Sequence, residues 1–353
     1  MPLSPTNSRG GLTVHSFVFI HGVQRPDEKE WVTAAWAHPS GYFWPRDLVS
    51  EVVPNARVMM FGYKPKRKFD ISSVTRLGNA KMLLRMVSKS RGTPRAQARP
   101  IILVAHCLGG LMAKEVCVGR LSPNQPGSPQ LRYQVVLRAD MDQSFTRMGQ
   151  RIVGLMFFGV PHRGANGVRY EDVLANIVRA AGGKVSKSFA NFIDIDINNV
   201  HLINHRFRGV IQRIQLVTFE EAGLTNVLMN KHFGRERWKE IVLLDWNASV
   251  LGVGSHIERV SQQKRAHNML CKFTSRDDNL YELPLFLKAL ANRCQMLVEA
   301  EAARREELAL KGLRPASEEV PLCDLPEAQE QLVVPGLVWS GILDNGQEKE
   351  MCM

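Results

Sequence analysis

A cysteine at position 107 stands where the sequence changes from a predicted strand to a predicted helix. The apolar run 101–105 indicates a buried strand, and Cys107 follows it with Leu108, Gly109 and Gly110. A nucleophile flanked by small residues at this kind of junction is typical of the nucleophile elbow, a strained turn that presents one side chain. The N–H groups that open the next helix point toward that side chain and favour a thiolate. The pattern predicts that Cys107 is a nucleophile for acyl transfer.

The remaining cysteines show no spacing typical of a metal site or of a redox motif. They are Cys117, Cys271, Cys294, Cys323 and Cys352. In a long chain without a secretory signal, such cysteines are usually inert and buried. A structural thiol of this kind is also the alternative interpretation of Cys107. The sequence indicates neither a metal nor an organic cofactor.

Acyl transfer also needs two N–H donors for the oxyanion that forms on the substrate. The first is expected to be the N–H of Leu108, directly after the nucleophile. The second is expected in the loop after the early strand 13–20, which ends in His21-Gly22, and we assign it to Val23. The alternative is that His21-Gly22 is only a turn that ends the strand.

An acid and then a histidine follow the nucleophile along chains that contain such an elbow. The acid is expected where the fifth strand, 214–219, meets Glu220 and Glu221. The histidine is expected after a sixth strand, which the apolar pattern predicts at 240–245, and His267 fits this position.

Several other residues compete for these roles. Asp245 is a rival acid, but its position inside a predicted strand favours a structural role, and His256 is the rival histidine. Asp194 and Asp196 lie in a weakly patterned stretch and are interpreted as solvated.

Two further histidines are expected near the nucleophile. His106 lies inside the elbow and is expected to pack beside Cys107. His162, in the loop 161–164, is expected to fix that loop and to border the pocket. Together with His21 and Gly22, these histidines form the predicted pocket lining.

Strands and helices alternate along most of the chain, which predicts βαβ units and an α/β fold with a mostly parallel central sheet covered on both faces. Further strands are expected at 56–63 and 152–158, and helices at 72–89, 111–118, 170–181 and 279–312. In such sheets the reacting groups lie on loops at the carboxyl ends of the strands. Residues 121–150 contain proline and glutamine with weak patterning, so they are predicted to form a peripheral surface insertion.

Charge is distributed unevenly along the chain. The formal net charge is +12, and residues 314–353 carry eight acidic and two basic side chains, net −6, which gives +18 for the preceding part. A basic body suits anionic ligands such as CoA, phosphopantetheine or phospholipid headgroups, and an ordinary solvated surface is the alternative. The sequence shows no recognisable nucleic-acid-binding module.

The ends of the chain differ from its centre. Residues 1–12 are expected to be a flexible N-terminus, residues 13–312 one domain, and residues 313–353 an acidic tail. No apolar run is long enough to span a bilayer and no signal peptide is recognisable, so a cytoplasmic location with at most peripheral membrane association is expected.

Four motifs resemble those of a known family. They are Val18-Phe-Ile-His-Gly22, Phe43-Trp-Pro-Arg-Asp47, the Ala105-His-Cys-Leu-Gly-Gly110 elbow and Phe157-Phe-Gly-Val-Pro-His-Arg-Gly164, and Ala248-Ser-Val-Leu-Gly252 and Cys271-Lys-Phe273 extend the match. They are similar to α/β-hydrolases with an active-site serine that are related to mitochondrial lipid-remodelling esterases and are common in fungi. The resemblance covers about residues 14–290 and implies the α/β-hydrolase fold. It also implies His267 as the catalytic histidine and Glu221 as the acid, with Glu220 second.

The chain departs from that family at the nucleophile, where Cys107 replaces the serine. Cysteine nucleophiles occur elsewhere on this fold, in dienelactone hydrolases and some biosynthetic thioesterases. We therefore expect an acyl-transfer enzyme, whether thioesterase, esterase, acyltransferase or cyclase, that works through an acyl-thioester on Cys107 in fungal secondary metabolism. Its substrate is expected to be an ester or thioester, bound to a carrier protein or CoA. A lipid esterase or phospholipid acyltransferase, as the family implies, and a catalytically silent scaffold are the alternatives.

Overall fold

The computed structural model describes most of the central part of the chain, and every statement below concerns that part. The described residues are 15–23, 31–63, 73–118, 148–149, 151–164, 167–183, 185, 200–232, 235–274, 281–311 and 337–339. The predicted insertion at 121–150, the predicted ends and Asp194 and Asp196 lie largely or wholly outside these ranges.

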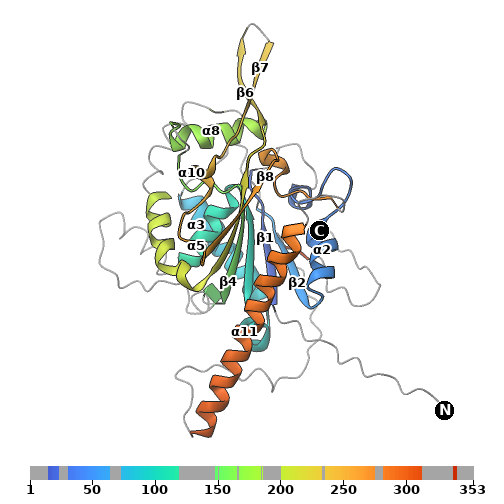
Figure 1. The fold of residues 1–353 in the computed structure, drawn as a ribbon, viewed down its shortest axis with the longest axis vertical. Helices are drawn as coiled ribbons and strands as arrows, with labels where there is room; N and C mark the ends of the chain where they lie inside the picture. Colours follow the sequence, from blue (N-terminus) through green and yellow to red (C-terminus); the bar gives the residue numbers. More distant parts are fainter. Residues whose placement is uncertain are drawn as a thin grey trace, which may run out of the picture.

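A central sheet of seven strands organises the molecule (Figure 1). The strands are β1 (His15–Ile20), β2 (Ala56–Phe61), β3 (Ile101–His106), β4 (Ile152–Phe158), β5 (Gln215–Glu221), β8 (Glu258–Gln263) and β9 (Leu337–Trp339). Their order is β8-β5-β4-β3-β1-β2-β9, and every pair from β8 to β2 is parallel. Only β9 pairs antiparallel, with β2 at the sheet edge. The predicted α/β class with a mostly parallel sheet is confirmed.

Helices cover both faces of the sheet. They are α1 (Trp31–Ala34), α2 (Trp44–Val52), α3 (Ser73–Lys89), α4 (Pro94–Ala98), α5 (Gly109–Val118), α8 (Tyr170–Ala180), α10 (Trp246–Ser249) and α11 (Glu282–Leu310), with 3-10 turns η1 (Ile211–Arg213) and η2 (His267–Met269). Residues 200–210 are also helical. The predicted helices correspond to α3, α5, α8 and α11.

Alternate side chains of each central strand enter two separate hydrophobic cores. Phe17 and Phe19 of β1 join a core with α1, α2 and α11, whereas Val18 and Ile20 join a core with α3, α5 and residues 200–210. Every residue of β1 and β3 is buried. A strand that is buried on both faces carries apolar side chains on both. Such a strand therefore appears in the sequence as a mostly apolar run.

The Phe43–Asp47 motif begins a helix and anchors a distant loop. Pro45 occupies the first turn of α2, where a missing N–H has no cost, and the Phe43 N–H donates to Asp47 Oδ2 at 2.8 Å. The Trp44 indole N–H donates to the Cys271 carbonyl at 2.8 Å. The motif therefore ties α2 to the segment that follows η2.

The prediction of a sixth sheet strand at 240–245 is wrong. Residues up to Ile241 belong to β7 (Arg235–Ile241), which pairs antiparallel with β6 (Thr225–His232) in a hairpin that projects from the body (Figure 1). The strand that precedes His267 in the sheet is β8. Its sequence, Glu-Arg-Val-Ser-Gln-Gln, is polar even at its buried positions, where Glu258, Ser261 and Gln263 lie. A search for apolar runs therefore passes over it.

No helix in the described ranges is both long and apolar enough to cross a membrane.

Candidate active site

Cys107 occupies a strained turn between β3 and α5. Its φ is +54°, and it is the only non-glycine residue with a positive φ in the described part of the chain. This conformation is costly for a residue with a Cβ and is often found at functional sites. The Cys107 N–H donates to the Phe158 carbonyl at 2.9 Å, and its carbonyl accepts from the Gly110 N–H at 3.0 Å. The turn is thus held by β4 on one side and by the start of α5 on the other.

Glycines allow other backbone segments to approach this turn closely. A Cβ on Gly22 would lie 2.4 Å from the Cβ of Cys107, and one on Gly109 would lie 2.5 Å from the His21 carbonyl oxygen. A Cβ on Gly110 would lie 2.3 Å from the side chain of Val160. The elbow and the loop after β1 can therefore be adjacent only because these positions have no side chain.

The Gly22→Ala variant is expected to be destabilised and to react poorly at Cys107. The new methyl would overlap the Cβ of Cys107 and lie 2.9 Å from the His106 carbonyl oxygen, neither of which can move without moving the elbow. Overpacking of this kind costs about 1–3 kcal/mol. Denaturant unfolding and the alkylation rate of Cys107 would measure both effects.

Gly78 in α3 provides the matched control, because no atom lies within 4 Å of a Cβ added there. Gly78→Ala is expected to stabilise the protein by about 0.5–1 kcal/mol through helix propensity, with no change at Cys107. Equal stability of Gly22→Ala and wild type would contradict the close packing described here.

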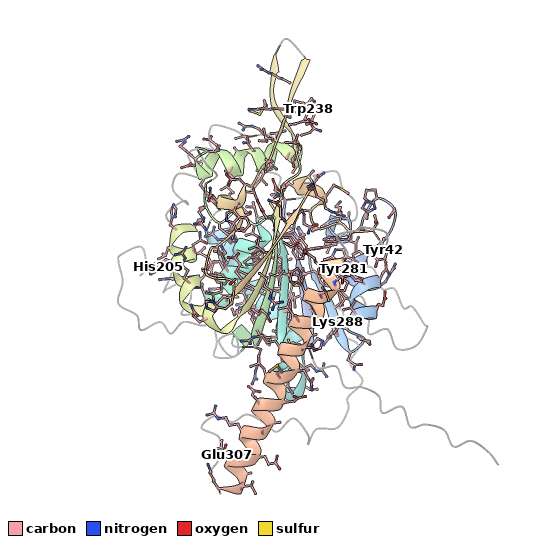
Figure 2. The ribbon with its side chains drawn as sticks, in the orientation of Figure 1. Tyr42, His205, Trp238, Tyr281, Lys288 and Glu307 are labelled. Atoms are coloured by element: carbon pink, nitrogen blue, oxygen red, sulfur yellow. The ribbon has the colours of Figure 1, made fainter. Side chains whose placement is uncertain are left out.

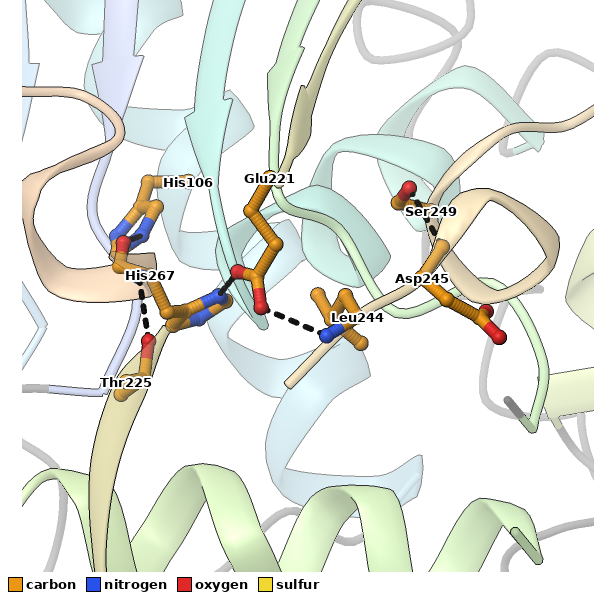
Figure 3. Close-up of polar contacts among 7 residues, drawn as sticks. All are labelled: His106, Glu221, Thr225, Leu244, Asp245, Ser249 and His267. Atoms are coloured by element: carbon orange, nitrogen blue, oxygen red, sulfur yellow. Dashed lines mark hydrogen bonds and ion pairs between the residues drawn. The ribbon is translucent and has the colours of Figure 1, made fainter. Parts of the chain in front are cut away.

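Glu221 and His267 form a buried pair beside the elbow (Figure 3). The distance from Glu221 Oε2 to His267 Nδ1 is 2.5 Å. The other carboxylate oxygen of Glu221 accepts the Leu244 N–H at 2.7 Å, and the His267 N–H donates to Thr225 Oγ1 at 2.8 Å. Thr225 and Leu244, at the two ends of the hairpin segment, therefore hold His267 and Glu221 in place.

The environment of His267 favours its protonated form. Burial lowers the pKa of His267, but the charges of Glu221 and Cys107 and hydrogen bonding to both side chains outweigh burial and raise the pKa to about 10. Nδ1 contacts Glu221, and Nε2 is buried without a nitrogen or oxygen partner among the described residues. The imidazole thus lies between the carboxylate and the thiol.

The order of these residues follows the order of the strands. Cys107 follows β3, Glu221 ends β5, and His267 comes after β8, and β3, β4, β5 and β8 are consecutive neighbours in the sheet. Parallel strands end at the same edge, so residues far apart in the chain meet there. This strand arrangement, with an elbow after the third strand and then an acidic residue and a histidine, is that of one enzyme fold.

The chain has an α/β-hydrolase fold.

No protein-family model matches the sequence, and no curated protein is similar enough in sequence to be matched. Solved structures with a detectable likeness include a lipase-esterase related protein from Clostridium acetobutylicum, with 10% identity over 79% of this chain and 95% of that one and a TM-score of 0.40. Esterase B from Lactobacillus rhamnosis has 13% identity over 82% of both chains and a TM-score of 0.41. Lipase 1 from Pelosinus fermentans has 11% identity over 79% of this chain and 99% of that one and a TM-score of 0.38. Similarity this low does not bear on function, and the fold assignment rests on strand order and the elbow.

The two predicted oxyanion donors lie close to Cys107. Val23 and Leu108 are half-buried and pack against the same apolar cluster as Cys107. Neither backbone N–H donates a hydrogen bond to another described residue.

An apolar cluster surrounds Cys107 at the carboxyl end of the sheet. Its buried members are Cys107, Leu111, Tyr170, Val173, Leu174, Ala175, Ile177, Val178, Val200, Val227, Leu243, Leu244 and Ala248. They come from α5, α8, residues 200–210, the hairpin and α10. This cluster is called here the apolar wall, and its polar groups are the Cys107 thiol and the Tyr170 hydroxyl.

His106 and His21 support the loops of the site. His106 Nε2 lies 3.1 Å from the His267 carbonyl oxygen, and burial together with the nearby His267 charge lowers the pKa of His106 well below its usual range. A neutral His106 can therefore donate to that carbonyl and fix the loop of His267. His21 is fully buried, contacts the Gly22 carbonyl through Nδ1 at 2.7 Å and stacks on Tyr63. Its contacts fix the loop that carries Gly22 and Val23.

His162 belongs to a buried polar cluster outside the Glu221–His267 pair. Its Nδ1 lies 2.5 Å from Lys114 Nζ, and Lys114 also donates to Asn204 Oδ1 at 2.6 Å. Burial lowers the pKa of both Lys114 and His162 well below their usual ranges. These contacts agree with the loop-fixing role expected for His162. The role of Lys114 could not be predicted from the sequence, because the sequence of an apolar helix does not indicate which distant residues a lysine in it will contact.

The rival residues lie elsewhere. Glu220 contacts Gln262 instead of His267, and burial raises its pKa. Asp245 is not in a strand: its Oδ1 accepts the Ala248 N–H at 2.9 Å as the N-cap of α10, and in Figure 3 it lies apart from the Glu221–His267 pair. His256 is exposed. The structural role expected for Asp245 therefore holds, although the reason given for it was wrong.

No cluster of three or more potential metal ligands occurs in the described ranges.

Proposed function

We propose that this protein is an acyl-transfer enzyme with Cys107 as nucleophile, His267 as its acid–base partner and Glu221 as the group that orients His267. The observation that supports this most directly is the 2.5 Å contact between Glu221 Oε2 and His267 Nδ1 beside a cysteine on a left-handed turn. A cysteine that only packs in the core does not require a strained backbone conformation or a buried ion pair beside it.

The acylation half-reaction follows from this arrangement. The Cys107 sulfur attacks the carbonyl carbon of an ester or thioester, and the N–H groups of Leu108 and Val23 stabilise the resulting oxyanion. The tetrahedral intermediate expels the alcohol or thiol, which takes its proton from Nε2 of His267. The acyl group remains on Cys107 as a thioester.

The second half-reaction returns the enzyme to its starting state. Now neutral, His267 removes a proton from the acceptor, which attacks the thioester carbonyl. The acyl group leaves with the acceptor, and Cys107 and His267 again share the proton. Glu221 keeps the same hydrogen bond throughout and fixes the ring.

The surroundings of the sulfur favour an apolar acyl group. Hydrophobic side chains of the apolar wall pack around Cys107 in the described part of the chain. An acyl chain buried against this wall would gain roughly 0.8 kcal/mol per CH₂ removed from water. A sulfur nucleophile suits thioester donors in particular, because exchange between two thioesters is nearly isoenergetic. Transfer of an apolar acyl chain from a thioester donor is therefore the preferred form of the proposal.

Intact mass measurement tests the proposal. The protein would be mixed with the N-acetylcysteamine thioester of octanoate, quenched in acid and weighed, with peptide mapping to locate the adduct. We expect one octanoyl group on Cys107.

Two variants serve as controls. Cys107→Ala should form no adduct, and Cys117→Ala should form it as wild type does, because Cys117 is a fully buried thiol on α5 away from the turn. An adduct that persists in Cys107→Ala, or product formation by that variant at the wild-type rate, would refute Cys107 as the nucleophile.

A further inference from the structure

One segment of the chain contacts the candidate active site on its inner side and solvent on its outer side. This segment, called here the docking segment, comprises residues 224–246 and includes the β6–β7 hairpin. On the inner side, Thr225 accepts the His267 N–H, Leu244 donates to Glu221, and Val227 is fully buried in the apolar wall. The outer side of the docking segment is therefore held at a fixed position relative to Cys107.

Large apolar side chains of the docking segment are exposed. Leu224 is 57% exposed, Trp238 51% and Trp246 52%, and Val242 is exposed as well. Trp238 lies on the projecting hairpin (Figure 2). By contrast, Trp36 and Trp44 are fully buried in the core. Trp238 lies in β7, and Trp246 begins α10 shortly after it in the chain. Large exposed apolar side chains concentrated in one segment are typical of an interaction surface.

Cations accompany these apolar side chains. Arg237 and Lys239 are exposed on either side of Trp238 in β7. The docking segment contains four lysines and arginines, two glutamates and one aspartate, so its formal charge is +4 − 3 = +1, within a chain of +12. The exposed Glu240 opposes this charge locally but does not reverse it. The partner that fits is anionic and has an apolar interior close to its charged surface.

We propose that the docking segment binds the surface of an anionic lipid bilayer, with Trp238 and Trp246 at the level of the headgroups and Arg237 and Lys239 against lipid phosphates. Indole rings prefer this interface because it accommodates both an apolar ring and an N–H donor. Cations near an anionic leaflet gain additional attraction. An acidic carrier protein would satisfy the cations but would leave two tryptophans and an exposed leucine without a matching apolar layer. This inference does not depend on acylation of Cys107.

Binding to vesicles of defined composition tests the inference with the full chain. Cosedimentation and tryptophan fluorescence would compare phosphatidylcholine vesicles with vesicles that also contain phosphatidylglycerol. We expect binding to the anionic vesicles with a blue shift of the emission, and weaker binding as salt is added. Arg237→Gln with Lys239→Gln should weaken binding about 25-fold, because each cation near the surface contributes roughly fivefold.

Variants of the tryptophans separate the apolar part from the charge. Trp238→Ala with Trp246→Ala should abolish the blue shift and most of the binding. The matched control is Tyr281→Ala with Leu285→Ala, which removes two exposed apolar side chains at the start of α11 and should bind as wild type does. Since all these side chains are exposed, thermal unfolding of each variant should match wild type.

Three outcomes would overturn the proposal. They are no binding to anionic vesicles, binding that the docking-segment variants leave unchanged, and binding to an acidic acyl carrier protein but not to vesicles. A failure to detect the acyl adduct on Cys107 would leave the vesicle result standing, so the two proposals fail separately.

Discussion

Glu221→Gln should acylate Cys107 on the order of 10³–10⁴-fold more slowly than wild type, a loss of the size seen when a triad acid becomes an amide. The carboxylate accepts a hydrogen bond from His267 Nδ1 at 2.5 Å. A glutamine can instead donate its amide N–H to Nδ1, which places the ring proton on Nε2. Nε2 would then be unable to take a proton from the thiol or the acceptor. Single-turnover acylation from the octanoyl thioester would measure the loss.

Glu220 offers a matched control one residue away. Glu220→Gln makes the same chemical change in a carboxylate that contacts Gln262 and not His267, so acylation should remain within about twofold of wild type. Similar losses in the two variants would mean that the change acts through general damage to β5. A loss confined to Glu220→Gln would show that Glu220, and not Glu221, is the acid that orients His267.

The contrast between these two glutamates shows what the sequence can and cannot predict. The elbow is a local pattern: a strand, a nucleophile, small neighbours and a helix all lie within residues 101–118. Because its geometry depends on neighbours in sequence, it could be predicted from them. Glu220 and Glu221 are adjacent and alternate sides of β5, so only the position of His267 decides between them. From the residues alone the choice stayed open, and only the family resemblance favoured Glu221.

Long-range contacts explain the remaining failures. Thr225 and Leu244 hold the Glu221–His267 pair, yet each lies on a segment whose pattern indicates only a strand or a loop. Leu244 uses its backbone N–H, a group that every residue except proline has, so its identity carries no signal. The polar strand β8 was overlooked because edge strands lack the apolar runs of central ones. Sequence patterns therefore predicted the buried sheet and the elbow, but not the polar support around them.

His267→Ala should slow iodoacetamide alkylation of Cys107 by an amount that depends on pH. In the folded protein, the pKa of His267 is raised to about 10, so the imidazolium persists through neutral pH beside the sulfur of Cys107. A cation next to a cysteine favours the thiolate, which is the form that reacts with iodoacetamide. An ordinary thiol without such a cation titrates near 8.5 and is mostly protonated at pH 6. The variant should therefore react more slowly than wild type at pH 6 and approach it near pH 9.

The pH dependence separates an electrostatic role of His267 from a structural one. A variant that merely loosened the fold would expose the thiol and would alkylate faster at every pH, while one that closed the site would be slower by a constant factor. Only loss of the imidazolium gives a deficit that shrinks as pH rises, because hydroxide then supplies the thiolate that His267 had maintained. His256→Ala is the matched control, since His256 is exposed and its loss should not alter the profile. A wild-type rate that rises steeply through pH 8.5, as for a free thiol, would rule out a thiolate–imidazolium pair.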